Sequence, residues 1–149
     1  MPTLDLTNLP DRRVGRVESV SVGQEGRLEQ VVRAEHGADR FQNAGVTVLA
    51  TPVLCHCFES AAVLAIAGQL EPGEGTVGTR LSIEHLTATP IGLRVRVTAR
   101  VVAAEGRRIN FEVSAFDDIE LVGRGTHQRF VVDLDRFLTG VQAKSASRT

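Results

Sequence analysis

Apolar and polar residues alternate along most of the second half of the chain. In residues 93–101 every second residue is apolar, and the positions between them hold three arginines and one threonine. Residues 109–115 repeat this alternation, and Glu105-Gly106 between the two segments is typical of a hairpin turn. Residues 121–133 are predicted to form a further strand. A period of two predicts antiparallel strands that are buried on one face and exposed on the other.

The first half of the chain contains one long apolar segment. Residues 52–69 are predicted to form a helix, and the stretch 61–67 has no polar side chain. Thr51-Pro52 would begin this helix with a good capping residue and a proline at the first helical position. A strand at 27–34 and a loop at 36–50 are predicted before it.

A helix that is apolar almost all round must be enclosed, and a sheet with one apolar face is a suitable enclosure. The pattern therefore predicts an α+β domain, the hot-dog fold, in which a curved antiparallel sheet wraps around one long central helix. Because the edges of such a sheet are commonly covered by a second subunit, we expect a homodimer. We expect the domain to span residues 11–137, between flexible tails at 1–10 and 138–149.

Composition excludes several classes of function. The 149 residues carry 17 basic and 18 acidic side chains and six Phe, with neither Trp nor Tyr. Without a positive field or stacking aromatics, we expect no binding to nucleic acid. No apolar run approaches the ~20 residues that cross a bilayer, and the start of the chain lacks the pattern of a signal peptide. We therefore expect a soluble, cytoplasmic protein that does not bind membranes.

Three polar residues stand where an ordinary core would place other side chains. Glu59 falls within the apolar helix, Thr51 at its start, and His85 on the apolar face of the next strand. A hydroxyl, a carboxylate and an imidazole are the groups that acyl transfer or hydrolysis uses for attack and proton transfer. These three residues are our candidate catalytic set. On one helix Thr51 and Glu59 lie roughly 12 Å apart, so they are not expected to touch.

Each candidate also has a structural interpretation. Thr51 is a good N-cap whether or not it does chemistry. His85 could be a hydrogen-bonded core histidine. Glu59 could pair with an arginine, although the cost of enclosing a carboxylate favours a function. His127 could orient a loop or line the site, and it stays outside the catalytic set.

No metal or cofactor is predicted. The side chains of Cys55-His56-Cys57 diverge on a helix, so they form neither a disulfide nor a metal site, and the cysteines are interpreted as structural thiols. The glycines within residues 73–78 fit Gly-x-Gly-x-x-Gly. They follow a helix and precede a strand, however, which is the reverse of the dinucleotide-binding order.

A set of short motifs runs through residues 27–137. They are Leu70-Glu71-Pro72-Gly73-Glu74-Gly75, Gly78-Thr79, His85, Thr87-Ala88-Thr89-Pro90, Gly92-Leu93, Glu105-Gly106-Arg107-Arg108, Val113-Ser114-Ala115 and Gly123-Arg124-Gly125-Thr126-His127. Their combination and spacing resemble the fluoroacetyl-CoA thioesterase family.

The resemblance implies hydrolysis of a short acyl-CoA, or a related acyl thioester, at a site where two subunits meet. It places the family's catalytic threonine, glutamate and histidine on Thr51, Glu59 and His85. No cofactor is implied. Backbone N–H groups near the helix start and around Gly78 are candidate donors to the oxyanion that forms during hydrolysis.

The loop before the helix departs from the family's pattern. A pair of phenylalanines forms an apolar gate in the family's characteristic enzyme, and Gln42 and Gly45 stand at those places, with Phe41 close but out of register. We expect Phe41, Gly45 and Gly78 to contact the substrate. Without the gate we expect no selectivity for a fluorinated acyl group, and a larger or more polar acyl chain could enter beside Gly45.

Two other functions fit the same residues. The first is a hot-dog dehydratase or isomerase, which would act on a β-hydroxy or enoyl thioester without releasing thiol. The second is a non-catalytic acyl-thioester-binding module, in which Glu59 and His85 are satisfied core groups. The arginines at positions 94, 96, 100, 107 and 108 are expected to form a solvated sheet face, with contact to CoA phosphates as the alternative.

Overall fold

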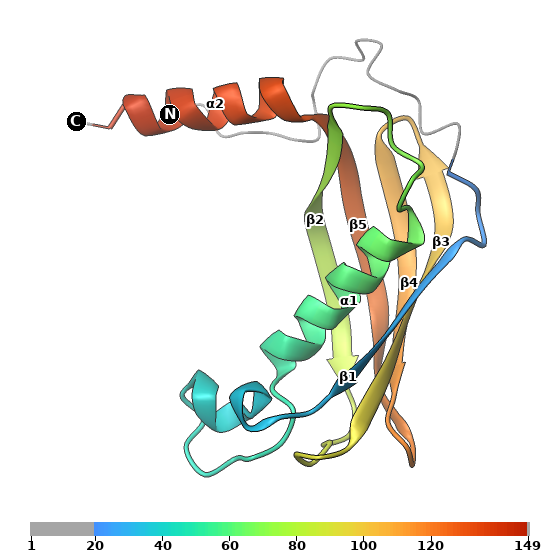
Figure 1. Cartoon of the computed structure of the whole chain (residues 1–149), viewed down its shortest axis with the longest axis vertical. Coiled ribbons are helices and arrows are strands. Elements are labelled where there is room, and N and C mark those ends of the chain that lie inside the picture. The colour runs from blue at the N-terminus through green and yellow to red at the C-terminus, as the bar shows by residue number, and fades with distance from the viewer. Residues whose placement is uncertain (1–19, 149) are drawn as a thin grey trace.

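The computed structural model describes residues 20–148, and five of its strands form one antiparallel sheet. The strands are β1 (Glu25–Val31), β2 (Glu74–His85), β3 (Arg94–Glu105), β4 (Arg108–Phe116) and β5 (Leu121–Asp133), in the order β1-β3-β4-β5-β2. Helix α1 (Thr51–Ala65) lies against one face of this curved sheet, and helix α2 (Leu134–Ala146) extends away from it after β5 (Figure 1). The predicted α+β architecture is confirmed.

The strands agree closely with the alternation in the sequence. β5 begins and ends at the predicted residues, and Glu105 pairs with Arg108 across a tight hairpin in which Gly106 has a φ of 58°. That backbone conformation favours glycine. The helices differ more from prediction. α1 ends at Ala65 rather than at residue 69, and the segment expected to be an irregular tail from residue 138 is helical to Ala146. The tail predicted at residues 1–10 lies outside the described residues.

α1 covers only part of the sheet. It packs mainly against β1 and β3 and has few contacts with β2 and β5. The close approach to β1 depends on Gly26, because a Cβ at this position would collide with the backbone of Ala61 and Ala65 in α1. The helix is therefore drawn towards the β1 edge, and the inner face of β2 and β5 is left more open.

A bulge divides β2 into two segments. Gly78 pairs with Arg129 and Arg80 with Gln128, so Thr79 is an extra residue in the ladder between β2 and β5. Side chains alternate between the two faces of a strand, and one inserted residue reverses the alternation beyond it. The bulge therefore places Gly78 on the same inner face as His85.

The loop between β1 and α1 contains two short 3-10 helices, Ala34–His36 and Ala38–Phe41. It is tied back to the body by backbone bridges that join Gly37 to Leu49 and Val48 to Pro90. Within residues 20–148, neither α-helix has both the length and the apolar character needed to cross a membrane.

Candidate active site

Thr51 and His85 form a hydrogen-bonded pair at the start of α1. The Oγ1 atom of Thr51 lies 2.7 Å from Nδ1 of His85 on β2. The prediction that Thr51 caps the helix is wrong, because Ala50 is the N-cap residue and Thr51 is the first residue of the helix. The Thr51 hydroxyl faces the His85 imidazole, and the helix start has no side-chain capping hydrogen bond.

The surroundings of His85 favour its neutral form. Burial lowers the pKa of His85 below its usual value, and the nearby backbone of Thr87 offsets part of this effect. A neutral ring with its proton on Nε2 can accept the hydroxyl proton of Thr51 at Nδ1. Nε2 is itself buried and has no hydrogen-bond partner within residues 20–148. The described residues therefore satisfy one ring nitrogen of His85, Nδ1, and leave Nε2 without a partner.

Glu59 lies on the same helix as Thr51 and interacts with a different group. Its Oε2 atom accepts a hydrogen bond of 3.3 Å from Nη1 of Arg129, and the two side chains form an ion pair. The single chain leaves the carboxylate partly open, since the Glu59 side chain is 47% exposed while that of Arg129 is 8% exposed. The displacement of α1 towards β1 explains this exposure. The structural alternative, pairing with an arginine, is also realised.

Arg129 is held by a polar cluster on the inner face of β2 and β5. Its Nε donates to Oγ1 of Thr76 at 2.9 Å, and Nη2 donates to the backbone carbonyl of Thr76 at 3.1 Å. Nη1 also lies 3.3 Å from Nε2 of the buried His127. Burial lowers the pKa of Arg129, and the charge and hydrogen bond of Glu59 act in the opposite direction. We call Thr76, His127 and Arg129 the guanidinium cluster.

Gly78 faces this cluster. A Cβ atom at Gly78 would lie 3.2 Å from Oε2 of Glu59 and 3.3 Å from both Nη1 of Arg129 and Cε1 of His127. These distances are tight for a side chain, so only glycine leaves this space open next to the carboxylate.

An open hollow of about 460 Å³ lies over Glu59 and Arg129. Its other walls come from α1 and include two half-exposed apolar side chains, those of Val63 and Leu64. The predicted substrate residues Phe41 and Gly45 lie in the loop before α1, where both are exposed. Apart from Gly45 and its two neighbours in the chain, no described residue has a heavy atom within 4 Å of a Cβ placed at Gly45, so this position borders open space.

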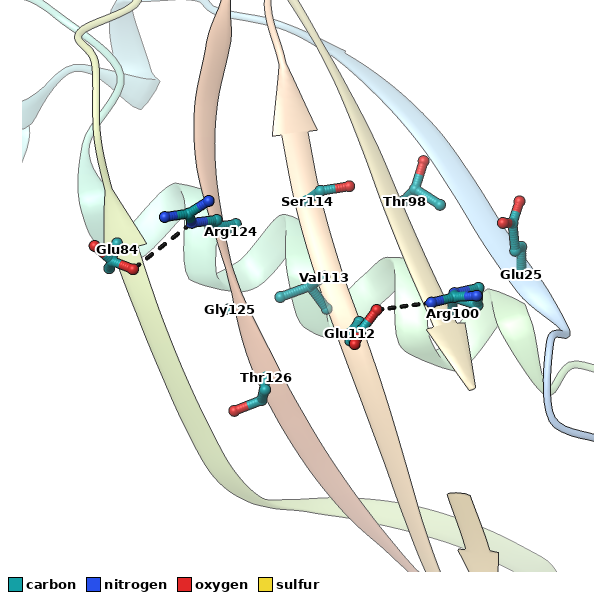
Figure 2. Close-up of a pocket in the computed structure, with 10 residues that line it drawn as sticks. All are labelled: Glu25, Glu84, Thr98, Arg100, Glu112, Val113, Ser114, Arg124, Gly125 and Thr126. Carbon is teal, nitrogen blue, oxygen red and sulfur yellow. Dashed lines mark hydrogen bonds and ion pairs between the residues drawn. The ribbon is translucent and has the colours of Figure 1, made fainter. Parts of the chain in front are cut away.

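A second hollow of about 460 Å³ lies on the outer face of the sheet, opposite α1 (Figure 2). Four of its charged side chains form two ion pairs, Arg100 with Glu112 at 2.8 Å and Arg124 with Glu84 at 3.7 Å. Arg94 and Arg96 pair in the same way with carboxylates. These ion pairs support the predicted solvated face, and that face lies on the side of the sheet away from Glu59.

The cysteines of α1 fit the interpretation as structural thiols. Both are free, and burial raises the pKa of Cys55 and of Cys57, with the charge of Glu59 adding to the effect at Cys55. A raised pKa keeps the thiol protonated and unreactive. Among residues 20–148, no group of three or more His, Cys, Asp or Glu side chains could hold a metal ion.

Arg129 was not among the residues selected from the sequence. The signal for it lies in β5, where His127 and Arg129 occupy alternate positions of a strand that is otherwise mostly apolar or glycine on its inner face. Two ionisable residues spaced by two on a buried face indicate a polar cluster, because single buried charges are costly. Thr76 offers no such signal, since a threonine is ordinary in a strand.

A family model described as fluoroacetyl-CoA-specific thioesterase matches residues 32–135 of the chain. The chain belongs to this family. It is 45% identical over 98 residues to the fluoroacetyl-CoA thioesterase of Streptantibioticus cattleyicolor, covering 66% of this chain and 70% of that protein. Membership confirms the predicted enzyme class, a thioester hydrolase.

Solved structures agree with the family and the fold. The fluoroacetyl-CoA thioesterase FlK aligns with a TM-score of 0.78 and 37% identity, over 83% of this chain and 96% of that one. Variants of that enzyme have been crystallised with acetyl-CoA and with fluoroacetate and CoA. A hot-dog-like protein from Thermanaerovibrio acidaminovorans aligns with a TM-score of 0.82 and 24% identity, over 88% and 97% of the two chains, which confirms the predicted hot-dog fold.

Proposed function

We propose that this family member hydrolyses acyl-CoA thioesters, with Thr51, His85 and Glu59 as its catalytic residues. The observation that carries the proposal is the 2.7 Å contact between Thr51 Oγ1 and His85 Nδ1. A hydroxyl next to a neutral imidazole is the arrangement that activates a weak nucleophile. Thr51 does not cap the helix, so its hydroxyl is available for this role.

The chemistry runs through two acyl transfers. Thr51 Oγ1 attacks the thioester carbonyl, and its proton moves to Nδ1 of His85. As the C–S bond breaks, the same proton passes to the departing sulfur, which leaves as free CoA thiol. Water then adds to the acyl-threonine ester and gives its proton to a base, and cleavage of the C–O bond restores Thr51 and releases the acid. In a one-step variant, the Thr51–His85 pair positions and deprotonates the water directly.

Glu59 is suited to the role of base for the water step. Its carboxylate stands at the open hollow beside Gly78 and is paired with Arg129. Eight residues of helix separate it from Thr51 by about 12 Å. The two residues can therefore serve one thioester only if the thioester lies between them, or if one of them comes from a second subunit.

The part of the sheet that α1 leaves uncovered is the surface at which we expect a second copy of the chain to bind. α1 leaves β2 and β5 partly uncovered, and β2 is an edge strand. Val63 and Leu64 beside the hollow are 46% and 49% exposed. Exposed apolar side chains and an unpaired strand edge are both typical of a subunit interface. We therefore propose a homodimer in which the partner closes the hollow over Glu59.

The loop before α1 determines which acyl groups enter. Gly45 has a φ of 82° and open space around it. A phenylalanine would be strained in this backbone conformation, so the loop is not arranged to carry an aromatic gate there. We propose that the substrate is an acyl-CoA without a requirement for fluorine, although relatives are named for fluoroacetyl-CoA.

Two features favour hydrolysis over a binding module with satisfied core groups. The Nε2 atom of His85 has no partner among the described residues, and nearly half of the Glu59 side chain is open to solvent. Groups with a purely structural role are normally buried and fully hydrogen-bonded.

The decisive experiment measures free thiol released from a panel of short, branched and aromatic acyl-CoAs, including the acetyl and fluoroacetyl esters. Wild-type protein is compared with His85→Ala and with Thr126→Val, which alters an exposed side chain on the outer face. Thiol release that His85→Ala abolishes and Thr126→Val preserves supports the proposal. Conversion of β-hydroxyacyl or enoyl esters without thiol release would establish a dehydratase or isomerase instead.

A further inference from the structure

The guanidinium of Arg129 depends on three acceptor residues. Thr76 accepts from Nε and Nη2, whereas Nη1 reaches both Oε2 of Glu59 and Nε2 of His127, each at 3.3 Å. Only 8% of the Arg129 side chain is exposed, so water has little access to replace a lost acceptor. A buried donor without a partner is costly, and the cation is therefore held where its acceptors are.

His127 can act as an acceptor in only one protonation state. Its Nδ1 atom lies 2.8 Å from the backbone carbonyl oxygen of Arg80. Because a carbonyl can only accept, Nδ1 carries the proton, and Nε2 of the neutral ring keeps a lone pair facing Nη1 of Arg129. A second proton on Nε2 would set one N–H against another and place two cations in contact.

The groups around the ring keep His127 neutral. Burial, the largest effect, lowers the pKa of His127, and the charge of Arg129 on the same strand lowers it further. The Arg80 carbonyl and the charge of Glu59 on α1 raise the pKa and offset part of this shift. From β4, Phe111 stacks on the imidazole with the ring centroids 5.9 Å apart. An apolar face on one side and a cation on the other both disfavour an imidazolium.

We propose that His127 is a positioning residue that fixes the guanidinium of Arg129 and, through it, the Glu59 carboxylate. The catalytic consequence rests on the proposed role of Glu59 in thioester hydrolysis. The Glu59 side chain is half-exposed, and its carboxylate accepts a hydrogen bond from Arg129. A shift of Arg129 therefore moves the carboxylate within the hollow. A displacement of about 1 Å at a reacting group can cost on the order of 10²-fold in rate.

Two variants separate the acceptor from the shape of the ring. His127→Phe keeps a flat ring against Phe111 and removes the acceptor, whereas His127→Gln can present a side-chain oxygen to Arg129. We expect kcat to fall roughly tenfold or more in His127→Phe with little change in KM, and to recover most of the wild-type value in His127→Gln. Thr126→Val, on the opposite face of the same strand, is the matched control.

A second readout does not depend on activity. In ¹⁵N spectra the four histidines of the chain can be assigned by substitution, and wild-type His127 should show the tautomer with its proton on Nδ1. The side-chain signals of Arg129 should shift or broaden in His127→Phe and stay near their wild-type positions in His127→Gln. If no variant or wild type releases thiol, the proposed function fails while these spectra still test the contact.

Three results would overturn the proposal. The first is a His127 that is protonated, or carries its proton on Nε2, in the wild-type protein at neutral pH. The second is a folded His127→Phe variant with wild-type kcat. The third is an equal loss of activity in His127→Phe and His127→Gln with unchanged Arg129 signals, because this would mean that the residue only fills space.

Discussion

The hydroxyl of Thr51 and the imidazole of His85 are separated by 34 residues in the sequence and by 2.7 Å in the fold. The first turn of α1 supplies one partner and the last residue of β2 supplies the other. α1 begins at Thr51 and β2 ends at His85, so the pair lies at the boundary between the core and the solvent. Thr51 is exposed on one side of this pair, whereas Nε2 of His85 is buried on the other.

Thr51→Val should abolish most thioester hydrolysis and leave the fold intact. Valine has nearly the same shape as threonine, and no helix cap is lost because Ala50 holds that position. We expect kcat/KM to fall by about 10²–10⁴-fold, with a free energy of unfolding within about 1 kcal/mol of wild type. Thr51→Ser, which retains a hydroxyl, should keep more activity. Equal activity of the valine and wild-type proteins would remove Thr51 from the catalytic set.

Glu59→Gln tests charge separately from hydrogen bonding. The amide oxygen can still accept from Arg129, and the carboxylate that it replaces is about half-exposed, so stability should change by only about 1 kcal/mol. The loss of a base should lower kcat by about 10²–10⁴-fold. Glu112→Gln is the control for the loss of a carboxylate, since Glu112 forms an exposed ion pair with Arg100 on the outer face. A similar loss of activity in both variants would contradict a specific role for Glu59.

Stability should fall as the pH is lowered from 7.5 to 5.5. His85 and His127 both have a folded-state pKa below the ordinary value of 6.5. Below pH 6.5 the unfolded chain therefore binds more protons than the folded chain, and folding becomes less favourable as the pH falls. Urea unfolding at the two pH values measures the effect, which should be smaller in His127→Gln. A higher stability at pH 5.5 would contradict the assigned shifts.

Two glycine substitutions should differ in whether they mainly lower activity or mainly lower stability. In Gly78→Ala the added methyl meets side-chain ends that can shift, so we expect a cost of about 1–3 kcal/mol. Activity should fall further, since Glu59 is one of the groups displaced. In Gly26→Ala the methyl meets the backbone of α1. We expect this variant to be far less stable or unfolded. Thermal unfolding and thiol release together distinguish the two cases.

The proposed dimer can be tested at the apolar side chains beside the hollow. Leu64→Arg places a charge at the expected interface, and light scattering should show a shift from dimer to monomer together with a loss of thiol release. Ile119→Arg is the control, because Ile119 is 79% exposed in the turn before β5. A wild-type protein that is monomeric and active would show that one subunit suffices.

The sequence predicted the strands well because alternation is a local property of the chain. β5 agrees with prediction at both ends, and the hairpin at Gly106 follows from its turn residues. The candidate residues Thr51 and His85 were also found, and the structure joins them. The capping role given to Thr51 failed because helix-start statistics take no account of an imidazole 34 residues away.

Long-range packing explains the other differences. The exposure of Glu59 results from the position of α1, which is set by contact with Gly26 on β1. The pairing of Glu59 with Arg129 joins residues that lie 70 positions apart. A side-chain cap from Asp133 stabilises the start of α2, although the end of the chain looks polar in composition.

Because of the bulge at Thr79, β2 should tolerate the deletion of this residue but not the deletion of a residue between Arg80 and His85. Removing Thr79 would join Gly78 directly to Arg80 and leave a regular ladder against β5, with the guanidinium cluster and His85 still on the same side. Removing one residue between Arg80 and His85 would instead turn one segment of the strand over and point His85 towards the solvent. In this strand a change of length by one residue can therefore separate Glu59 and Arg129 from the Thr51–His85 pair without altering any of their side chains.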